Sequence, residues 1–547
     1  MTLAAGPGIT CLQMSITPDQ LQAERTGHKY DTLNLIVLIL VACVLGIYLI
    51  ATTVLISKDG VLYIEQARLY SSDPGAVIRK DTPGYPFLIF AAHKFAGIFG
   101  DKSSLLGWIH AAQGVTLLFR LLGLVPLYLI GKRLVGPRNS FYAMLILILL
   151  PHPAKMTCEL TREWPYAFFL TTGFLLLLRG AGCAGWRTFG AAGLAAGLAH
   201  IVRPEGAQLV VFGVLWLSLK LARPGRDMTR TRIVLALAAL LIGFAIPVGP
   251  YAKARGKIMP GKMRELLLTS SESAGRSAEG DDSDSRRGAC ATAGVLSGVG
   301  EAIYELCEKI NENLLYFFVP PMLVGIYVRL RSRRKGFNED RFLVSSFVVF
   351  NVTMLILLYQ NYHYMSRRHA LPLVLIGVFY VPWGLRAISD RLEREIIRNH
   401  PPSAKNSLRW FTILLIIGIV VCLPKLIEPA GADKQGCRDA AEWLKKNSSV
   451  DDVVMAADPR IGFYAERKRL TPDNDVTEGA DYVVKIVGKS GEPAHLTRGA
   501  QEVYSVGING RQESDKKVIV YRMLRPEAEG NSGSPALSSE DGGDREQ

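Results

Sequence analysis

Residues 33–56 read LNLIVLILVACVLGIYLIATTVLI, and after one serine the chain continues as Lys58-Asp-Gly-Val-Leu-Tyr-Ile-Glu-Gln-Ala-Arg68. The apolar run carries no charge and is long enough to cross a bilayer hydrocarbon core of about 30 Å. We therefore expect Asp59 at the boundary between membrane and water. Behind it, Tyr63 and Tyr70 recur at helical spacing, which predicts an amphipathic helix along the interface.

The composition is typical of a membrane protein with soluble parts. Hydrophobic residues make up 49% of the 547 residues, the mean hydropathy is +0.20, and the apolar residues are clustered. The formal charge of +14 could indicate a nucleic-acid ligand. However, the basic residues gather in short loops between apolar runs, where they act as topology signals. We therefore expect no nucleic-acid partner.

The N-terminus shows no cleavable signal, and the cysteines show no CxxC or metal-binding pattern. Residues 1–32 lack the basic-then-apolar order of a cleavable signal, so we expect a cytoplasmic segment and a first span retained as an anchor. The eight cysteines show neither CxxC spacing nor histidine partners, which is typical of small buried hydrophobes.

Ten further apolar stretches bring the expected number of transmembrane helices to about eleven, several of them near the short limit for spanning. These stretches are residues 108–134, 141–150, 165–178, 189–202, 207–221, 233–251, 314–328, 342–359, 370–385 and 410–427.

The distribution of lysine and arginine predicts the orientation. Four loops collect these residues, at 132–138, 220–232, 329–335 and 391–405. With eleven spans, all four loops fall on the same side, which the positive-inside rule identifies as the cytoplasm. The loop that carries Asp59 and the C-terminal region then face outward, across a cell inner or plasma membrane.

Composition also divides the chain into domains. The expected membrane domain, residues 33–428, has two large outer loops at 58–107 and 252–313, and within the second the polar tract 271–287 predicts a mobile loop. Residues 433–525 have the composition of a small α/β domain outside the cytoplasm. Its expected helices are 438–446 and 460–467, and its expected strands are 452–458, 482–487, 502–506 and 517–521. Residues 526–547, rich in glycine, serine and acidic residues, predict a disordered tail.

Polar side chains expected on the outer face cluster at the ends of spans. The groups are Asp59 with Tyr63 and Glu65, Arg79-Lys80-Asp81, Glu159-Leu-Thr-Arg-Glu163, Arg203-Pro-Glu205 and His363-Tyr-Met-Ser-Arg-Arg-His369. Guanidinium pairs bidentately with phosphate, and a carboxylate can take a proton from an acceptor. Carboxylates beside arginines at a wet interface therefore suit a phosphorylated, lipid-linked substrate.

Each group also has a structural interpretation. Arginines 367–368 suit side chains that snorkel to the interface. Arg203 and Glu205 suit a turn closed by its own ion pair, since buried charges are usually paired. Glu163 suits the N-terminus of a helix, where a negative charge is favourable.

The order of short motifs resembles the dolichyl-phosphate-mannose–protein mannosyltransferase-like group of the GT-C glycosyltransferases, which includes the lipid A aminoarabinose transferases. The matching elements are Asp59 with Tyr63 and Ala67-Arg68, Thr82-Pro-Gly-Tyr-Pro86, Phe99-Gly100, Glu163, Gly197-Leu-Ala-His-Ile-Val-Arg-Pro-Glu-Gly206, Tyr364 and Arg368, and the C-terminal Ala440-Ala-Glu-Trp-Leu444, Asp458-Pro-Arg460 and Tyr464. The resemblance covers residues 33–522 and lies in the order and topology of these motifs.

In that family an acidic residue of the first outer loop is the catalytic base for transfer from a polyprenyl-phosphate sugar, which implies this role for Asp59. Members often carry Asp-Glu at this point, whereas here Gly60 follows. A second carboxylate then has to come from elsewhere, and Glu65 and Glu163 are the nearest candidates.

The resemblance implies Asp59 and Glu163 as catalytic residues. The residues implied in substrate binding are Tyr63, Glu65, Lys80, Arg203, Glu205, Arg367 and Arg368, of which Lys80, Arg203, Arg367 and Arg368 would hold the donor phosphate. Some relatives bind a divalent metal, but no ligand set stands out in this sequence, so no cofactor is required and a metal stays an open alternative.

The sequence thus predicts a polytopic α-helical membrane protein of GT-C type that transfers a hexose or pentose, with inversion, from a polyprenyl-phosphate donor to a protein, lipid or glycan acceptor. A transporter or lipid flippase is the alternative, because Arg120 and His200 lie inside or near apolar runs. A scaffold whose outer domain binds glycan is a third interpretation.

Overall fold

A computed structural model describes residues 18–98, 104–183, 185–222, 228–256, 285–331, 339–396, 404–470, 479–488, 499–511 and 514–524. The chain forms two compact units that divide at residue 433. The expected tail at 526–547 and most of the expected mobile loop at 271–287 lie outside the described residues.

Each of the eleven stretches expected to span the membrane contains a helix. The corresponding helices are α1 (Pro18–Thr52), α5 (Leu105–Val135), α6 (Pro137–Leu149), α8 (Glu163–Cys183), α9 (Trp186–Val202), α10 (Gln208–Ala222), α11 (Arg230–Arg255), α14 (Val319–Arg331), α15 (Glu339–Tyr362), the consecutive α16 (Leu371–Gly377) and α17 (Val381–Ile396), and α18 (Ala404–Ile427). The helical parts that connect them are α2 (Lys58–Leu69), α3 (Pro74–Lys80), α4 (Gly84–Ala96), α7 (Pro151–Lys155), η1 (Pro204–Ala207), α13 (Ser285–Asn313) and η2 (Val378–Tyr380).

Within the described residues, seven helices are long and apolar enough to cross a membrane. The expected spans at α6, α8, α9 and α14 are not among them. Helix α8 is buried along most of its length between α5 and α9, so it belongs to the interior of the bundle. Helix α1 ends at Thr52, earlier than expected, because Val54 and Leu55 instead donate backbone hydrogen bonds to the carbonyl of Ala430 (3.0 and 3.3 Å).

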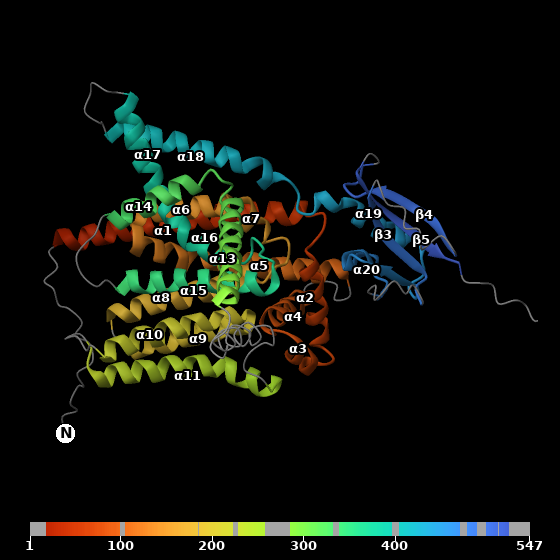
Figure 1. Ribbon diagram of the computed structural model, residues 1–547, viewed down its shortest axis with the longest axis horizontal. Coiled ribbons are helices and arrows are strands. Elements are labelled where there is room, and N and C mark those ends of the chain that lie inside the picture. The colour runs from red at the N-terminus through yellow and green to blue at the C-terminus, as the bar shows by residue number, and fades with distance from the viewer. Residues whose placement is uncertain are drawn as a thin grey trace, which may run out of the picture. The chain divides into compact units, whose positions relative to one another are not determined.

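The long helix α5 separates two groups of contacts. At the C-terminal end of α5, Lys132 pairs with Asp31 of α1, and Arg133 pairs with Asp340 of α15 (2.9 Å). The N-terminal end of α5 packs against α2 and α4, which cluster with α3 at one end of α8 and α9 (Figure 1). A helix of 31 residues rises about 46 Å, so these groups lie at opposite ends of the bundle.

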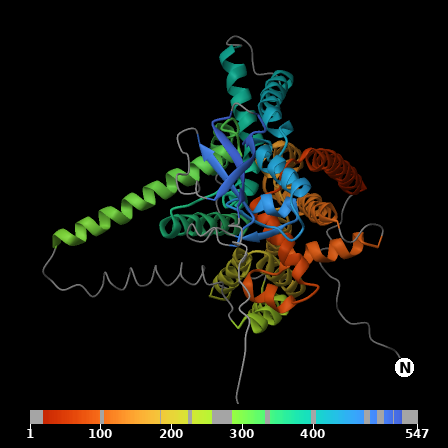
Figure 2. The ribbon, with the colours of Figure 1, turned by 90° about the vertical axis from the view of Figure 1, so that its right-hand side faces the viewer.

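Helix α13 differs in direction from the rest. It runs across the bundle helices rather than along them (Figures 1 and 2). Its C-terminal part packs against α7, α15 and α16, where Leu306 is buried, whereas Ile303 and Tyr304 are exposed. An amphipathic helix across the bundle direction is typical of a segment that lies in the membrane interface.

The second unit is a small α/β domain. Its elements are η3 (Ala432–Lys434), which leads into it, α19 (Gln435–Asn447), β1 (Val453–Ala456), α20 (Pro459–Ala465), β2 (Lys468–Leu470), β3 (Tyr482–Gly488), β4 (Ala500–Gly507) and β5 (Lys516–Met523). The strand order is β2-β1-β3-β5-β4, with β1 parallel to both neighbours and β5 antiparallel to both of its neighbours. The sequence analysis does not predict β2, because three residues, two of them charged, carry no alternating pattern.

Helices α9 and α11 approach each other through glycine. A Cβ atom at Gly193 would lie 2.0 Å from the carbonyl oxygen of Leu240, and one at Gly243 would lie 2.2 Å from that of Gly190. Small residues at such positions let two helix backbones come close, as is common in membrane bundles. The contact fixes α9, whose C-terminus carries Arg203.

We expect Gly193→Ala to lower the free energy of unfolding by about 2 kcal/mol, because one methyl group would overlap the α11 backbone. Gly190→Ala is the matched control, since a Cβ atom there would meet its nearest neighbour at 3.6 Å, an ordinary contact. Thermal unfolding of both variants in detergent measures the difference. Equal stability of the two variants would contradict the close packing.

Candidate active site

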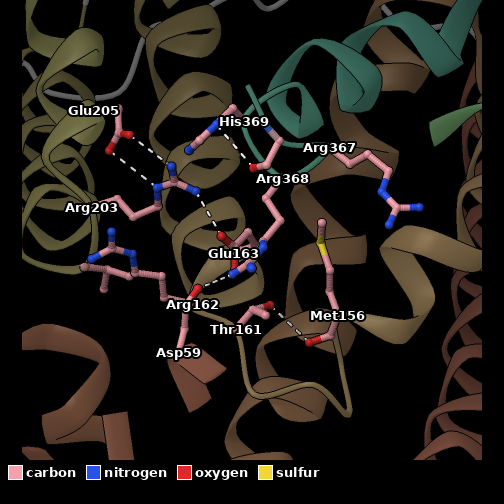
Figure 3. Close-up of polar contacts among 12 residues, drawn as sticks. Asp59, Met156, Thr161, Arg162, Glu163, Arg203, Glu205, Arg367, Arg368 and His369 are labelled. Carbon is pink, nitrogen blue, oxygen red and sulfur yellow. Dashed lines mark hydrogen bonds and ion pairs between the residues drawn. The ribbon is translucent and has the colours of Figure 1, made fainter. Parts of the chain in front are cut away.

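Asp59 pairs with an arginine from a distant part of the chain. It is the second residue of α2, whose N-cap Ser57 accepts a hydrogen bond from the backbone N–H of Gly60 (3.0 Å). Arg368, which is 309 residues away and precedes α16, donates to the Asp59 carboxylate (Figure 3). The Asp59 and Arg368 side chains are 47% and 32% exposed, so the pair is accessible from outside the bundle.

Gly60 allows the first turn of α2 to pack closely on the segment before α8. A Cβ atom at Gly60 would lie 2.8 Å from the Cβ of Leu160 and 3.2 Å from the Glu159 carbonyl oxygen. The Ser57 N–H donates to that same carbonyl (3.1 Å), and Leu160 has a φ of 59°, which is rare for a leucine. A glutamate side chain at position 60 would therefore collide with Leu160.

Three charged residues form a chain of ion pairs beside Asp59. Arg203 donates to Glu163 (3.1 Å) and, through two nitrogens, to Glu205 (3.0 and 3.4 Å), as Figure 3 shows. The Glu163 and Arg203 side chains are only 6% and 8% exposed. We call Glu163, Arg203 and Glu205 the triad. Two carboxylates and one guanidinium give it a net charge of −1 when both acids are ionised.

The break between α9 and η1 positions Arg203. Arg203 has extended backbone angles and caps α9, and Pro204 then starts the short 3-10 helix η1. The hydroxyl of Thr82 donates to the carbonyl of Val202 (3.1 Å), and the guanidinium of Arg203 lies 5.4 Å from the Tyr166 ring centroid. The triad is therefore supported by the loop between α3 and α4, by α8 and by α9 together.

One carboxylate oxygen of the triad lacks a hydrogen-bond donor among the described residues. Glu163 Oε1 accepts from Arg203, but Oε2 is buried and, among the described residues, has no hydrogen-bond partner. A small pocket borders it. The pocket is lined by Glu163, Tyr166, Ala167, Leu170, Arg203, Arg368, Leu371, Pro372 and Leu375. It therefore combines charged groups with an apolar wall.

Arg162 joins the same region, although the sequence analysis does not single it out. Its guanidinium donates to the Thr82 hydroxyl (2.9 Å), lies 3.9 Å from an Asp81 oxygen and 5.9 Å from the ring centroid of Tyr63. Burial raises the pKa of Tyr63 to about 12, so this phenol is neutral at pH 7. The only sequence signal for Arg162 is its place next to Glu163 at the start of a span.

Three residues expected at the site lie outside these contacts. Arg367 is turned away from Arg368 (Figure 3), is half-exposed and lies 3.6 Å from Glu312 of α13. Lys80 is the exposed last residue of α3. Glu65 is half-buried farther along α2.

The carboxylates of this region do not fit a metal. No group of three His, Cys, Asp or Glu side chains that could hold a metal ion occurs in the described part of the chain. Asp59, Glu163 and Glu205 are each paired with an arginine, which competes for the same oxygens. We therefore assign no metal to this site.

Part of the sequence matches a known family, and the fold is similar to those of known proteins. The family model for dolichyl-phosphate-mannose-protein mannosyltransferase matches residues 80–251. The fold is similar to that of ArnT from Cupriavidus metallidurans bound to undecaprenyl phosphate, at 11% identity and a TM-score of 0.54, covering 89% of this chain and 97% of that one. It is also similar to the oligosaccharyltransferase AglB from Archaeoglobus fulgidus in complex with an inhibitory peptide and a dolichol-phosphate, at 12% identity and a TM-score of 0.52, covering 83% and 69%. No curated protein matches the sequence.

The chain thus shares its fold with ArnT and AglB, and residues 80–251 match the mannosyltransferase family model. It is an integral, multi-pass membrane protein with the GT-C fold. The match to the family model includes Arg162 and the whole triad, but it ends before Arg368 and begins after Asp59. Asp59 and Arg368, which pair with each other, thus come from the two flanks of the matched region.

We expect Arg203→Met to lower the free energy of unfolding by about 3 kcal/mol, because Glu163 would be left buried without its cation. Arg79→Met is the control. Arg79 also faces a carboxylate, Asp73, but at 3.8 Å and with both side chains more than half exposed, so its loss should change stability by less than about 0.5 kcal/mol. Thermal unfolding in detergent compares the two, and similar losses would contradict a buried triad.

Glu159 gives a pH-dependent prediction. Burial raises its pKa above the ordinary value, although Arg368, Lys155 and Arg367 act to lower it. An acid with a raised pKa in the folded state costs stability when the pH is above its ordinary value, and the cost vanishes below that value because both states are then protonated. We therefore expect Glu159→Gln to raise the melting temperature at pH 7.5 and to have progressively less effect as the pH falls toward 4. A gain that does not change with pH would disagree with this assignment.

Proposed function

We propose that this chain transfers a monosaccharide from a polyprenyl-phosphate-linked donor to an acceptor at the outer face of the membrane, with Asp59 as general base. The observation that carries the proposal is the Asp59–Arg368 pair, which lies beside the triad and the pocket at one end of the bundle. ArnT and AglB, which share the fold, are bound to undecaprenyl phosphate and a dolichol-phosphate in their structures. That favours a lipid phosphate as the donor's leaving group.

The proposed reaction is an inverting displacement. Asp59 takes the proton of the acceptor hydroxyl, and the oxygen forms a bond to the anomeric carbon of the donor sugar. The bond between that carbon and the phosphate oxygen breaks, and its electron pair leaves with the polyprenyl phosphate. Arg368 meets the charge that develops on this phosphate, which lowers the barrier by electrostatic stabilisation.

The triad has a proposed role in binding the donor. Arg203 neutralises one oxygen of Glu163 and leaves the other, Oε2, beside the pocket. An unpaired carboxylate oxygen is costly to bury, so a hydroxyl or ammonium group of the donor that donates to it would be bound favourably.

The charge of the loops supports an outer location for the site. The basic loop at residues 132–138 lies at the opposite end of α5 from α2 and α4. If that end faces the cytoplasm, Asp59 and Arg368 face outward, and so does the C-terminal unit.

The residues that made a transporter an alternative have structural partners. Arg120 donates to the Ile148 carbonyl (2.9 Å) and to the Thr157 hydroxyl (3.2 Å). His200 Nδ1 lies 3.0 Å from the carbonyl oxygen of Pro204. The Arg120 contacts tie α5 to α6 and to the loop after α7, and the His200 contact closes the turn after α9, so both side chains have structural roles. We therefore propose no transport function.

We expect Asp59→Asn to lower the rate of transfer by 10²–10⁴-fold, since amide cannot act as a base, while the melting temperature changes little. The measurement is release of polyprenyl phosphate by purified protein in detergent, with a panel of radiolabelled polyprenyl-phosphate monosaccharides. Glu428→Gln is the control, because Glu428 belongs to a separate ion pair with Lys155 (3.3 Å). Full activity of a folded Asp59→Asn protein would overturn the proposed base.

A further inference from the structure

The Asp59–Arg368 pair poses a chemical problem. In the proposed reaction Asp59 has to accept a proton and Arg368 has to contact the donor phosphate. In the structure, however, the two side chains are hydrogen-bonded to each other. The Asp59 oxygen that accepts from Arg368 is engaged with the cation rather than with an acceptor hydroxyl. The protein without donor therefore holds its base in a paired form.

Arg368 is placed to serve two partners. It contacts the Asp59 carboxylate and, in the same position, lines the pocket together with Glu163 and Arg203. Figure 3 shows Arg368 directed between Asp59 and Glu163. The pair with Asp59 is partly exposed, at 47% and 32%, and exposed ion pairs contribute little to stability. A ligand that binds the Arg368 guanidinium more tightly than Asp59 does can therefore break the ion pair at a small cost in free energy.

The backbone around Arg368 is fixed, so the side chain alone has to move. The amide of Asn313, which is completely buried, donates to the carbonyl of Arg367 (3.0 Å). The ring Nδ1 of His369 lies 3.2 Å from both the backbone nitrogen and the hydroxyl of Ser366. Asn313 thus anchors the segment before α16 from α13, and the His369 contacts close its own turn. Rotation of the long arginine side chain is then the simplest change available.

We infer that Arg368 exchanges partners: the phosphate of the lipid donor takes it from Asp59, and Asp59 becomes a free base only when the donor is bound. The inference rests on the proposed function, because it takes a lipid phosphate as the ligand. Phosphate offers several acceptor oxygens and pairs bidentately with guanidinium, which makes it a strong competitor for Arg368. In the protein without donor, the Asp59 carboxylate binds the guanidinium that the phosphate would bind.

The exchange has a consequence that a simple catalytic role does not have. If Asp59 competes with the phosphate for Arg368, removal of the Asp59 charge should tighten the binding of the lipid phosphate even though it abolishes transfer. From the usual strength of an exposed ion pair, the expected gain in affinity is about threefold. The gain should require Arg368, since without the arginine there is nothing to compete for.

The experiment is a double-mutant cycle on binding. The dissociation constant of undecaprenyl phosphate is measured for the full-length protein in detergent as wild type, Asp59→Asn, Arg368→Gln and the double variant, each checked by thermal unfolding. We expect Asp59→Asn to bind about threefold more tightly than wild type and Arg368→Gln to bind more weakly. The double variant should bind no more tightly than Arg368→Gln alone.

Glu428→Gln is the control for a general effect of charge, because it also removes one carboxylate from a surface ion pair. A gain in affinity for Glu428→Gln equal to that for Asp59→Asn would overturn the exchange, and so would a gain that persists without Arg368. Equal or weaker binding by Asp59→Asn would also overturn it, while leaving the proposed transferase intact. No binding by either wild type or Asp59→Asn would overturn the lipid-phosphate donor and the exchange with it.

Discussion

The site depends on one buried ion pair, between Arg203 at the end of α9 and Glu163 at the start of α8. Both side chains are less than a tenth exposed, and a buried charge without a partner costs several kcal/mol. Each therefore requires the other, which brings the ends of two helices together. Glu205 satisfies the rest of the Arg203 guanidinium, and the second oxygen of Glu163 is left beside the pocket. The two residues that hold the helix ends together are thus the same two that we propose to contact the donor.

A second buried arginine supports the segment that carries Glu159 and Arg162. Arg120 is completely buried in the middle of α5, and it bonds the C-terminal end of α6 and the loop after α7. Its guanidinium also lies 5.6 Å from the ring centroid of Trp164, whose indole N–H donates to the Pro153 carbonyl (3.0 Å). These contacts fix the loop on which α2 packs through Gly60. The position of Asp59 is therefore set by groups deep in the bundle as well as by the membrane boundary.

The sequence analysis identifies the polar groups at the ends of the helices, but not which of these side chains contact each other. Asp59, Glu163, Arg203, Glu205 and Arg368 were expected near the outer ends of spans, and the structure brings them together. Arg367 was expected to bind donor phosphate as well, yet it lies against α13 instead, because adjacent residues in this turn point in different directions. Arg162 was missed since its partners, Thr82 and Tyr63, come from other elements. The sequence shows only that Gly60 stands where the family often has an acid, and the close packing against Leu160 explains the glycine.

The sequence by itself determined where the long helices of the bundle lie, the charge of the loops and the α/β character of the C-terminal unit, but among the described residues fewer helices than expected are long and apolar enough to cross a membrane. These properties are local, because the length of an apolar run and the alternation of strand residues are set by neighbours along the chain. Only the tertiary structure decided which charges meet. Glu163 and Arg203 are 40 residues apart, and Asp59 and Arg368 are 309 residues apart. Ion pairs form within about 4 Å, and contact at that distance follows from how helices pack, which no single stretch of sequence encodes.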